Sequence, residues 1–342
     1  MAIFKSEDTK GKREDLASFI SMITRDETPF LSSIGTKKAT SVFHEWQTDE
    51  LAAPAANAKA EGLDYTAADT PSSTTRLGNY SQILVKEIKV SKTLDSVSKA
   101  GRNSEFAYQM KKKGTELKRD LEHALIGSRQ ITSGSGVADA VPDNTGRTMG
   151  GVQSWIPKDH VWDASAGTPA FQAAAGGNGA TAHTDGTAGT HTLALTDVDE
   201  VMQKVYEEGG KATVLMMSPS NKRSFSALAQ AASNVRRNID EIGSLRQSVE
   251  LYESDFGIVK VVPNYIQGLA NGVDISVGVG GTTDVIVYDP SWWAMANLRA
   301  LHTTDVGQKG DSTVGMMVEE TTLECRNPSG SGMISGLGVI VS

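Results

Sequence analysis

The chain has 342 residues, a net charge of −8 and a single cysteine among its residues. One cysteine excludes an intramolecular disulfide, and no stretch approaches the ~18 uncharged apolar residues that a membrane-spanning helix needs. The acidic balance, 41 acidic against 33 basic residues, argues against long-range attraction of the whole chain to nucleic acid or to an anionic membrane. The length favours two domains, or one domain with elaborations.

The N-terminal region, residues 1–37, mixes charges with a short helix-like stretch and ends in TPFLSSIG. It has no apolar core region, so we expect neither a secretion signal nor a transit peptide, and the single cysteine suits a reducing cytoplasm. We interpret this region as an arm that docks through apolar side chains, namely Phe19, Ile20, Ile23, Phe30 and Leu31. A simple N-terminal helix on its own core fits the residue pattern equally well.

Two strand-like runs, 41–48 and 80–94, are joined by a segment that is almost entirely small or polar. Between 52 and 79 the only sizeable apolar side chains are Leu63, Tyr65 and Leu77. Ordering a backbone residue costs ~1–2 kcal/mol, whereas burying one such side chain returns only ~1.5–3 kcal/mol. Internal contacts therefore fall far short, and we predict that residues 38–94 form an extended loop that lies on another subunit or another chain.

Residues 103–127 form the clearest helix of the sequence, with apolar residues at steps of three and four. Asn103 is the expected N-cap, and Gly127 is expected to end the helix in the left-handed conformation. About 24 residues at ~1.5 Å each give a rod of roughly 36 Å, which suggests a structural spine. Charged residues, Glu122 among them, lie off the apolar stripe, and we interpret the cluster Lys111–Lys113 as a solvated helix face.

Beyond this helix the chain is irregular and rich in Gly, Ala and Thr over 157–192, which resembles a surface loop. Alternating helices and strands over 196–290 indicate a compact α/β domain. Thr196 is the expected N-cap of a helix over 197–208, and Ser218 and Pro219 are the expected N-cap and first residue of a second helix. Two long strands joined at VGQKGD follow. Adjacent Trp292 and Trp293 would point to opposite faces if extended, so one should enter a core and the other a contact surface.

No set of residues makes a convincing catalytic, cofactor-binding or metal site. VGVGG (277–281) lacks the G-x-G-x-x-G spacing and is interpreted as a turn. His183 and His191 stand eight apart without cysteine or carboxylate partners at metal-ligand spacing. Cys325 lies in a strand-like run without a recognisable histidine partner, which favours an inert thiol. We therefore expect no enzyme activity and no cofactor.

Six stretches carry a resemblance to a known family through their order and spacing. They are TPFLSSIG (28–35), EWQTDELAAPAANAKAEG (45–62), NYSQILVKEIKVS (79–91), AGRNSEFAYQMKKKGTELKRDLEHALIG (100–127), GGVQSWI (150–156) and GDSTVGMMVEETTLECRNPSGSGMISGL (310–337). Together they resemble the major capsid (major head) proteins of tailed bacteriophages, whose shell-forming fold is shared with encapsulins and the herpesvirus capsid floor. The resemblance covers nearly the whole chain and departs from the family over 157–192.

The resemblance implies an α+β fold, the tailed-phage major capsid protein fold, in four parts. These are an N-terminal arm (1–37), an extended β-hairpin loop (38–94), a peripheral domain with the spine helix (95–195 and 292–342) and an axial α/β domain (196–291). Candidate contacts between subunits follow from the exposed parts and the two tryptophans: Phe30, Leu31, Trp46, Leu63, Tyr65, Leu77, Tyr80, Trp292 and Trp293.

The implied function is structural: self-assembly through pentamers and hexamers into an icosahedral head that encloses phage double-stranded DNA. The protein would be assembled in the cytoplasm of the bacterial host and located in the virion. Implied partners are copies of the chain, a portal protein, optional scaffold and cement or decoration proteins, and packaged DNA through weak non-specific contact, with no membrane partner.

Three alternatives stay open at this stage. An encapsulin-like compartment would use the same shell fold. A phage tail or adhesin protein that binds carbohydrate would fit the Gly/Thr-rich stretch and exposed tryptophan. An enzyme built on the 196–291 unit would need a polar pocket at the strand ends.

Overall fold

The computed structural model describes residues 27–62, 73–97, 103–127, 131–134, 146–163, 192–231, 249–267, 282–308 and 310–338. The expectations for residues 1–26, for Leu63 and Tyr65 and for residues 164–191 lie outside these ranges. The helices are α1 (Pro29–Ser33), α2 (Lys92–Ser96), α3 (Glu105–Ile126), α4 (Val152–Trp155), α5 (Leu195–Glu207) and α6 (Pro219–Ala231), with short 3-10 turns η2 (Lys158–His160), η4 (Pro290–Trp292) and η5 (Pro328–Gly330). The strands are β1 (Gly35–Lys38), β2 (Phe43–Thr48), β3 (Thr75–Tyr80), β4 (Gln82–Ser91), β5 (Val161–Asp163), β6 (Val214–Met217), β7 (Leu251–Ser254), β8 (Gly257–Pro263), β9 (Thr282–Tyr288), β10 (Trp293–Gln308), β11 (Ser312–Cys325) and β12 (Gly332–Gly338).

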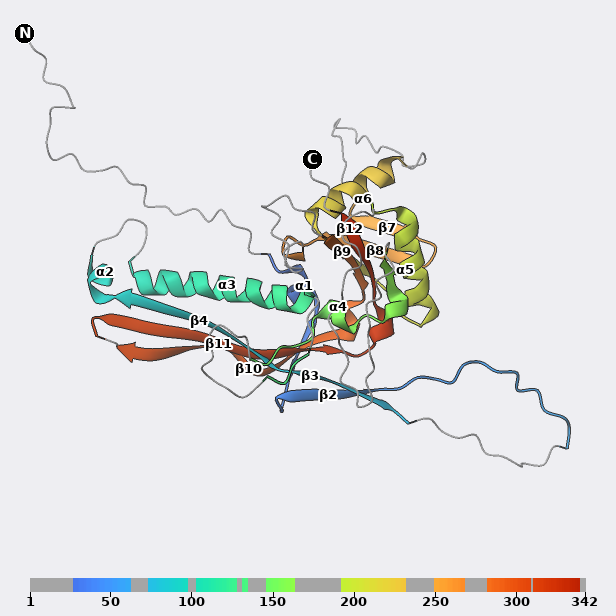
Figure 1. The fold of residues 1–342 in the computed structure, drawn as a ribbon, viewed down its shortest axis with the longest axis horizontal. Helices are drawn as coiled ribbons and strands as arrows, with labels where there is room; N and C mark the ends of the chain where they lie inside the picture. Colours follow the sequence, from blue (N-terminus) through green and yellow to red (C-terminus); the bar gives the residue numbers. More distant parts are fainter. Residues whose placement is uncertain are drawn as a thin grey trace, which may run out of the picture.

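A four-stranded sheet in the order β1-β10-β11-β4 forms the elongated part of the body (Figure 1). Strands β10 and β11 pair as one long antiparallel hairpin, which confirms the two long strands predicted around VGQKGD. Strand β4 pairs antiparallel with β11 from Gln82 to Ser91. Residues 82–91 therefore belong to this sheet, and the prediction that 80–94 forms one side of the extended loop is wrong.

Helix α3 lies along one face of this sheet, over β4 and β11. Its 22 residues span about 33 Å at ~1.5 Å per residue, and the predicted apolar stripe is confirmed by the burial of Leu117, Leu121 and Leu125. The N-cap is Ser104, whose hydroxyl accepts a hydrogen bond from the Ala107 amide, and not Asn103.

The end of α3 also differs from the prediction. Gly127 has φ −64°, so it is not a left-handed cap, and the chain leaves the helix extended. Gly151 packs directly against this end, because a Cβ at Gly151 would lie 2.0 Å from the carbonyl oxygen of Gly127. The backbone approach between the two glycines fixes where the helix stops.

A six-stranded sheet in the order β5-β12-β9-β6-β8-β7 forms the second unit, with α5 and α6 on one face (Figure 1). Val198 of α5, Phe225 of α6, and Val259 and Val287 of the sheet are buried in the core between them. The predicted α/β unit over 196–290 is present. Its sheet also takes in β5 and β12, because Ile334 and Leu337 of β12 are buried in the same core, so the expected limits of 196 and 291 were too narrow.

Helix α5 begins at Leu195, two residues before the predicted start at 197, and Ala194 holds the N-cap position expected for Thr196. The carboxylate of Asp197 accepts a hydrogen bond of 2.8 Å from the Ala194 amide, which satisfies a free donor of the first turn. Helix α6 begins as predicted at Pro219, and the Ser218 hydroxyl accepts from the Asn221 amide.

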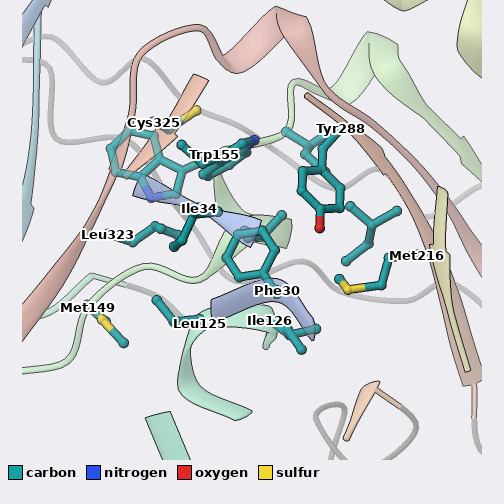
Figure 2. Packing of buried hydrophobic residues seen from close by; sticks show 14 of the residues in the cluster. Phe30, Ile34, Leu125, Ile126, Met149, Trp155, Met216, Tyr288, Leu323 and Cys325 are labelled. Atoms are coloured by element: carbon teal, nitrogen blue, oxygen red, sulfur yellow. The ribbon is translucent and has the colours of Figure 1, made fainter. Parts of the chain in front are cut away.

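A second core joins the two sheets (Figure 2). Phe30 of α1 lies at its centre, with ring centroids 5.3 Å from Tyr288 of β9 and 6.1 Å from Trp293 of β10. Leu125 of α3 and Trp155 of α4 complete the surroundings. The body therefore has a substantial interior of its own.

Candidate assembly surface

Strands β2 and β3 form a two-stranded antiparallel ribbon that projects from the body. Its register runs from Phe43 opposite Tyr80 to Thr48 opposite Thr75, and Figure 1 shows it on the side of the four-stranded sheet away from α3. The partner of β2 is therefore 75–80. Gly78 of β3 leaves room for the ring of Phe43, because a Cβ at this position would lie 2.5 Å from the ring and displace it.

The base of the ribbon is tied to the body by a buried amide. The Asn79 side chain donates to the Leu323 carbonyl of β11 at 2.8 Å and accepts from the Gly150 amide at 3.0 Å. Trp46 of β2 also stacks against Trp155 with ring centroids 5.3 Å apart. Because Trp46 pairs with Leu77 and His44 with Asn79, these residues share one face of the ribbon, and that face is held by elements that belong to the core.

Glu324 of β11 forms a second attachment of the ribbon and of β1. Its carboxylate accepts hydrogen bonds from Lys37 at 2.9 Å, His44 at 3.0 Å and Arg326 at 3.0 Å, while only 4 % of its side chain is exposed. Burial would raise the pKa of Glu324, but the hydrogen bonds from His44, Lys37 and Arg326 outweigh it and hold the pKa at about 2. The group therefore stays ionised through neutral and mildly acidic pH.

Glu320, four residues earlier on β11, holds the junction between the ribbon and β4. One carboxylate oxygen accepts from Arg147 at 2.6 Å and from the Ser81 hydroxyl at 2.9 Å. The other accepts from Arg299 at 2.7 Å. Because Ser81 separates β3 from β4, this network fixes the direction in which the ribbon leaves the sheet.

The segment beyond the ribbon, residues 49–62, is exposed at every position. It is built from small and polar residues, and its one large apolar side chain, Leu51, is 99 % exposed. A rigid base thus carries a segment with no contacts to its own body in the described residues.

The short helix α1, which follows the N-terminal region, is held by an unusual cap. Thr28 makes no side-chain capping bond, and the carboxylate of Glu122 on α3 accepts from the amides of Phe30 at 2.8 Å and Leu31 at 2.7 Å. Asn264 donates to the same group at 2.8 Å. Burial raises the pKa of Glu122, and these three hydrogen bonds oppose the rise. Glu122 lies off the apolar stripe of α3, as the sequence indicates, but its side chain is buried by α1 and Asn264.

The nine predicted contact residues fall into three groups. Phe30, Leu77 and Trp293 are 0 %, 3 % and 1 % exposed, so their side chains stabilise the chain's own core and offer no surface to a neighbour. This corrects their assignment as contacts. Leu31, Trp46, Tyr80 and Trp292 are partly exposed, and Leu63 and Tyr65 lie outside the described residues.

Several exposed apolar side chains were missed by the sequence reasoning. Leu51 could have been found, since it is the one large apolar residue in a small-residue run. Ile83 and Val85, 45 % and 42 % exposed, occupy alternate positions of β4 on the face away from α3. Their alternation with Leu84 was visible, but the covered face could be chosen only once α3 was placed.

The described residues give little support for a metal site, a membrane-spanning helix or a reactive thiol. They contain no group of three or more His, Cys, Asp or Glu side chains arranged to hold a metal ion. Among the helices described, none combines the length and apolar character needed to cross a membrane. Cys325 is fully buried, and this burial raises the pKa of its thiol, which opposes thiolate chemistry.

An elongated sheet with a spine helix, a second α/β unit and a projecting ribbon define a class of protein, the subunits of closed protein shells. Solved structures with this fold include the following three. That of Mycobacterium phage Ogopogo has a TM-score of 0.59 at 10 % identity and covers 98 % of this chain and 99 % of that one. The capsid of a native GTA particle has a TM-score of 0.57 at 14 % identity and covers 97 % of both chains. The holo-SrpI encapsulin complex of Synechococcus elongatus PCC 7942 has a TM-score of 0.56 at 10 % identity, covering 97 % of this chain and 94 % of that one.

Sequence similarity places the chain within this class. Residues 3–338 match the family described as SU10 major capsid protein, and the chain belongs to that family. A similar protein, the major capsid protein of Escherichia phage Phieco32, is 28 % identical over 358 residues, covering 97 % of this chain and 96 % of the relative.

The expected capsid fold and structural capsid role are thereby confirmed. The protein is a structural component of the virion that associates with copies of itself in the shell. Family membership favours the phage head over an encapsulin-like compartment, and over a tail or adhesin protein.

Proposed function

We propose that the chain assembles through pentamers and hexamers into the icosahedral head that encloses double-stranded DNA, with residues 49–62 lying across a neighbouring subunit. The observation that carries this proposal is the complete exposure of 49–62 at the end of a firmly anchored ribbon. Ordering this segment costs on the order of 20 kcal/mol at ~1–2 kcal/mol per residue. The described residues of its own chain offer no burial in return, so a neighbouring copy is the natural source of contact.

The two units take different places in this proposal. The four-stranded sheet and α3 form the peripheral part, which meets neighbours around local threefold positions. The six-stranded unit forms the axial part around fivefold and sixfold axes. Heterologous contacts of this kind close into rings and then into a shell, and their summed area would fall in the obligate class of ~2,000–5,000 Å².

Further partners follow from the capsid role. They are a portal protein, scaffold and cement or decoration proteins, and packaged DNA in weak non-specific contact. Assembly would take place in the cytoplasm of the bacterial host, and the chain would act without enzymatic activity of its own.

The proposal is tested by replacing residues 51–73 with a short Gly-Ser turn and imaging the purified protein by electron microscopy. The replacement stops before β3, because Leu77 belongs to the core. We expect closed shells from the wild type and a folded, soluble variant that makes none of normal size. A matched control of unchanged length, in which Ala52, Ala53, Ala55 and Ala56 become Ser, should still form shells. Shells of normal size from the shortened variant would overturn the assignment of the segment.

A further inference from the structure

Four cationic side chains on α3 form a surface with no ion-pair partner among the residues that the structure describes. Lys111, Lys112, Lys118 and Arg119, here termed the α3 basic face, make no ion pair with any described residue. Neighbouring cations are paired: Lys113 lies 2.5 Å from Glu116, and Lys86 lies 2.5 Å from Asp120. Lys118 acts only at longer range, on the buried Glu319 of β11.

Helical geometry gathers these four side chains on one side of α3. At about 100° per residue, Lys112 and Arg119 lie nearly opposite the buried stripe of Leu117 and Leu121, and Lys111 and Lys118 lie together on one side, about 90° from that stripe. The carboxylates of this helix do not offset them, because Glu105 and Glu122 are buried and Glu116 and Asp120 are paired. In a chain of net charge −8, this is a local positive surface.

Arg119 adds a specific requirement for an acceptor. It lines a pocket of about 250 Å³ together with Lys86, Glu116, Asp120, His123 and Ile266, in which the two carboxylates are paired with Lys113 and Lys86. Its Nε is buried and has no hydrogen-bond partner among the described residues. A buried donor without a partner costs ~1–3 kcal/mol, and a phosphate oxygen is an acceptor that guanidinium groups bind well.

Two acidic surfaces could neutralise this face in a shell, and their positions distinguish them. The exposed segment 49–62 carries Asp49, Glu50 and Glu61, but the ribbon projects from the opposite side of the sheet from α3 (Figure 1). Subunits of a shell share one radial orientation, so a neighbour's ribbon would reach the ribbon side of the wall. A polyanion held on the other side of the wall fits the α3 basic face better.

We propose that the α3 basic face lines the interior of the shell and binds the phosphate backbone of the enclosed double-stranded DNA without reading its sequence. This inference rests on the proposed function, in which the shell encloses DNA. Flexible lysines acting as point charges suit a contact that tolerates any sequence.

The test compares two triple variants that each remove three exposed positive charges. The patch variant is K111Q/K112Q/K118Q, and the matched control is K38Q/K211Q/K260Q, which alters three exposed lysines outside α3. Binding of a mixed-sequence 30-base-pair DNA duplex to subunits dissociated from shells is measured between ~50 and ~200 mM salt. Each lost phosphate contact reduces the salt slope by ~0.9. The patch variant should therefore lose up to ~2.7 of the slope, which makes its affinity fall up to about 40-fold less over this range, while the control keeps the wild-type slope.

A second measurement locates the contact in intact particles. Formaldehyde cross-linking of DNA-filled particles, followed by mass spectrometry, should find nucleotide adducts at Lys111, Lys112 or Lys118 and not at Lys38 or Lys211. Equal salt slopes in the two variants, or adducts confined to the control lysines, would overturn the inference. So would loss of shells in the patch variant with an unchanged DNA slope, because the face would then contact another protein. Failure of the wild type to form shells would instead contradict the proposed function, and duplex binding would still be scored separately.

Discussion

Substitution of Glu122 by Ala removes a buried carboxylate that joins three separate parts of the chain. The backbone amides of Phe30 and Leu31 and the side chain of Asn264 all donate to it, at 2.7–2.8 Å. Leaving a buried donor without a partner costs ~1–3 kcal/mol, so three donors give roughly 3–9 kcal/mol. Burial of the charged carboxylate is itself unfavourable, as the raised pKa of Glu122 indicates. Its removal therefore recovers part of this loss. We expect E122A to lower the free energy of unfolding by about 3–5 kcal/mol, in the upper range for single substitutions.

Urea denaturation of dissociated subunits, followed by circular dichroism, measures this loss. The control is E116A on the same helix, because the Glu116 side chain is 27 % exposed and pairs with Lys113 at 2.5 Å. Such a pair contributes ~0–1 kcal/mol. Hydrogen exchange should also speed up at the amides of Phe30 and Leu31 in E122A. Equal losses in the two variants, with unchanged exchange at these amides, would refute the capping role.

Four further substitutions and conditions test the remaining parts of the account. Leu51→Ala should leave the free energy of unfolding of dissociated subunits unchanged, since this side chain is 99 % exposed. It should weaken assembly by ~1.5–3 kcal/mol per contact, which light scattering against subunit concentration measures. Unaltered assembly would argue against burial of Leu51 in the shell. The pKa of Glu324 falls from 4.5 to about 2 on folding, so its contribution to stability, up to about 3 kcal/mol, is present above pH ~4.5 and is lost as pH falls toward 2. In E324Q the free energy of unfolding should therefore fall less steeply with pH over this range than in the wild type. An unchanged pH dependence would exclude Glu324 as its source. Gly151→Ala should lower the free energy of unfolding by roughly 1–3 kcal/mol or prevent folding, because its Cβ would meet three backbone oxygens. The control is Gly35→Ala, whose Cβ would meet nothing within 4 Å. Similar thermal unfolding of the two variants would contradict the close approach of Gly151 to the end of α3. Asn79→Ala should lower the free energy of unfolding by about 2–4 kcal/mol, because three buried hydrogen bonds are lost. It should also free the base of the ribbon, so that proteolysis near residue 80 becomes faster than in the wild type. Unchanged stability and cleavage would show that another contact holds the ribbon.

The parts of the fold that could be predicted from the sequence are those whose signal is local. The apolar stripe through Leu117, Leu121 and Leu125 requires a helix whatever lies around it. The signals for the long strands around VGQKGD and for the helix that begins at Ser218 and Pro219 likewise come from residues adjacent in sequence. These elements appear where they were expected, within a few residues.

The ribbon partner could not be predicted in the same way. Strand β3 reads TRLGNY, with a glycine, an asparagine and only one aliphatic residue, a composition that favours a loop. Its strand character comes from pairing with β2 and from the burial of Asn79 beneath β11. Those neighbours are distant in sequence, so composition alone indicates an unpaired connection.

Distant neighbours also explain why some residues predicted to contact other subunits are instead buried in the chain's own core. Phe30 and Trp293 are large apolar residues in segments that looked peripheral, but the fold brings them together with Tyr288 across more than 250 positions of sequence. Glu122 lies off the apolar stripe as expected, but only the tertiary arrangement supplies the backbone amides of Phe30 and Leu31 that donate to it. Burial by distant segments is a property of the fold, which residue type does not reveal.

Hydrogen exchange of residues 49–62, measured in dissociated subunits and in assembled shells, tests the central claim most directly. We predict rapid exchange at these amides in the dissociated subunit, where the segment is exposed throughout, and strong protection once the shell has formed. Equal exchange rates in the two states, or protection already present in a single subunit, would contradict the claim that a neighbouring copy holds this segment.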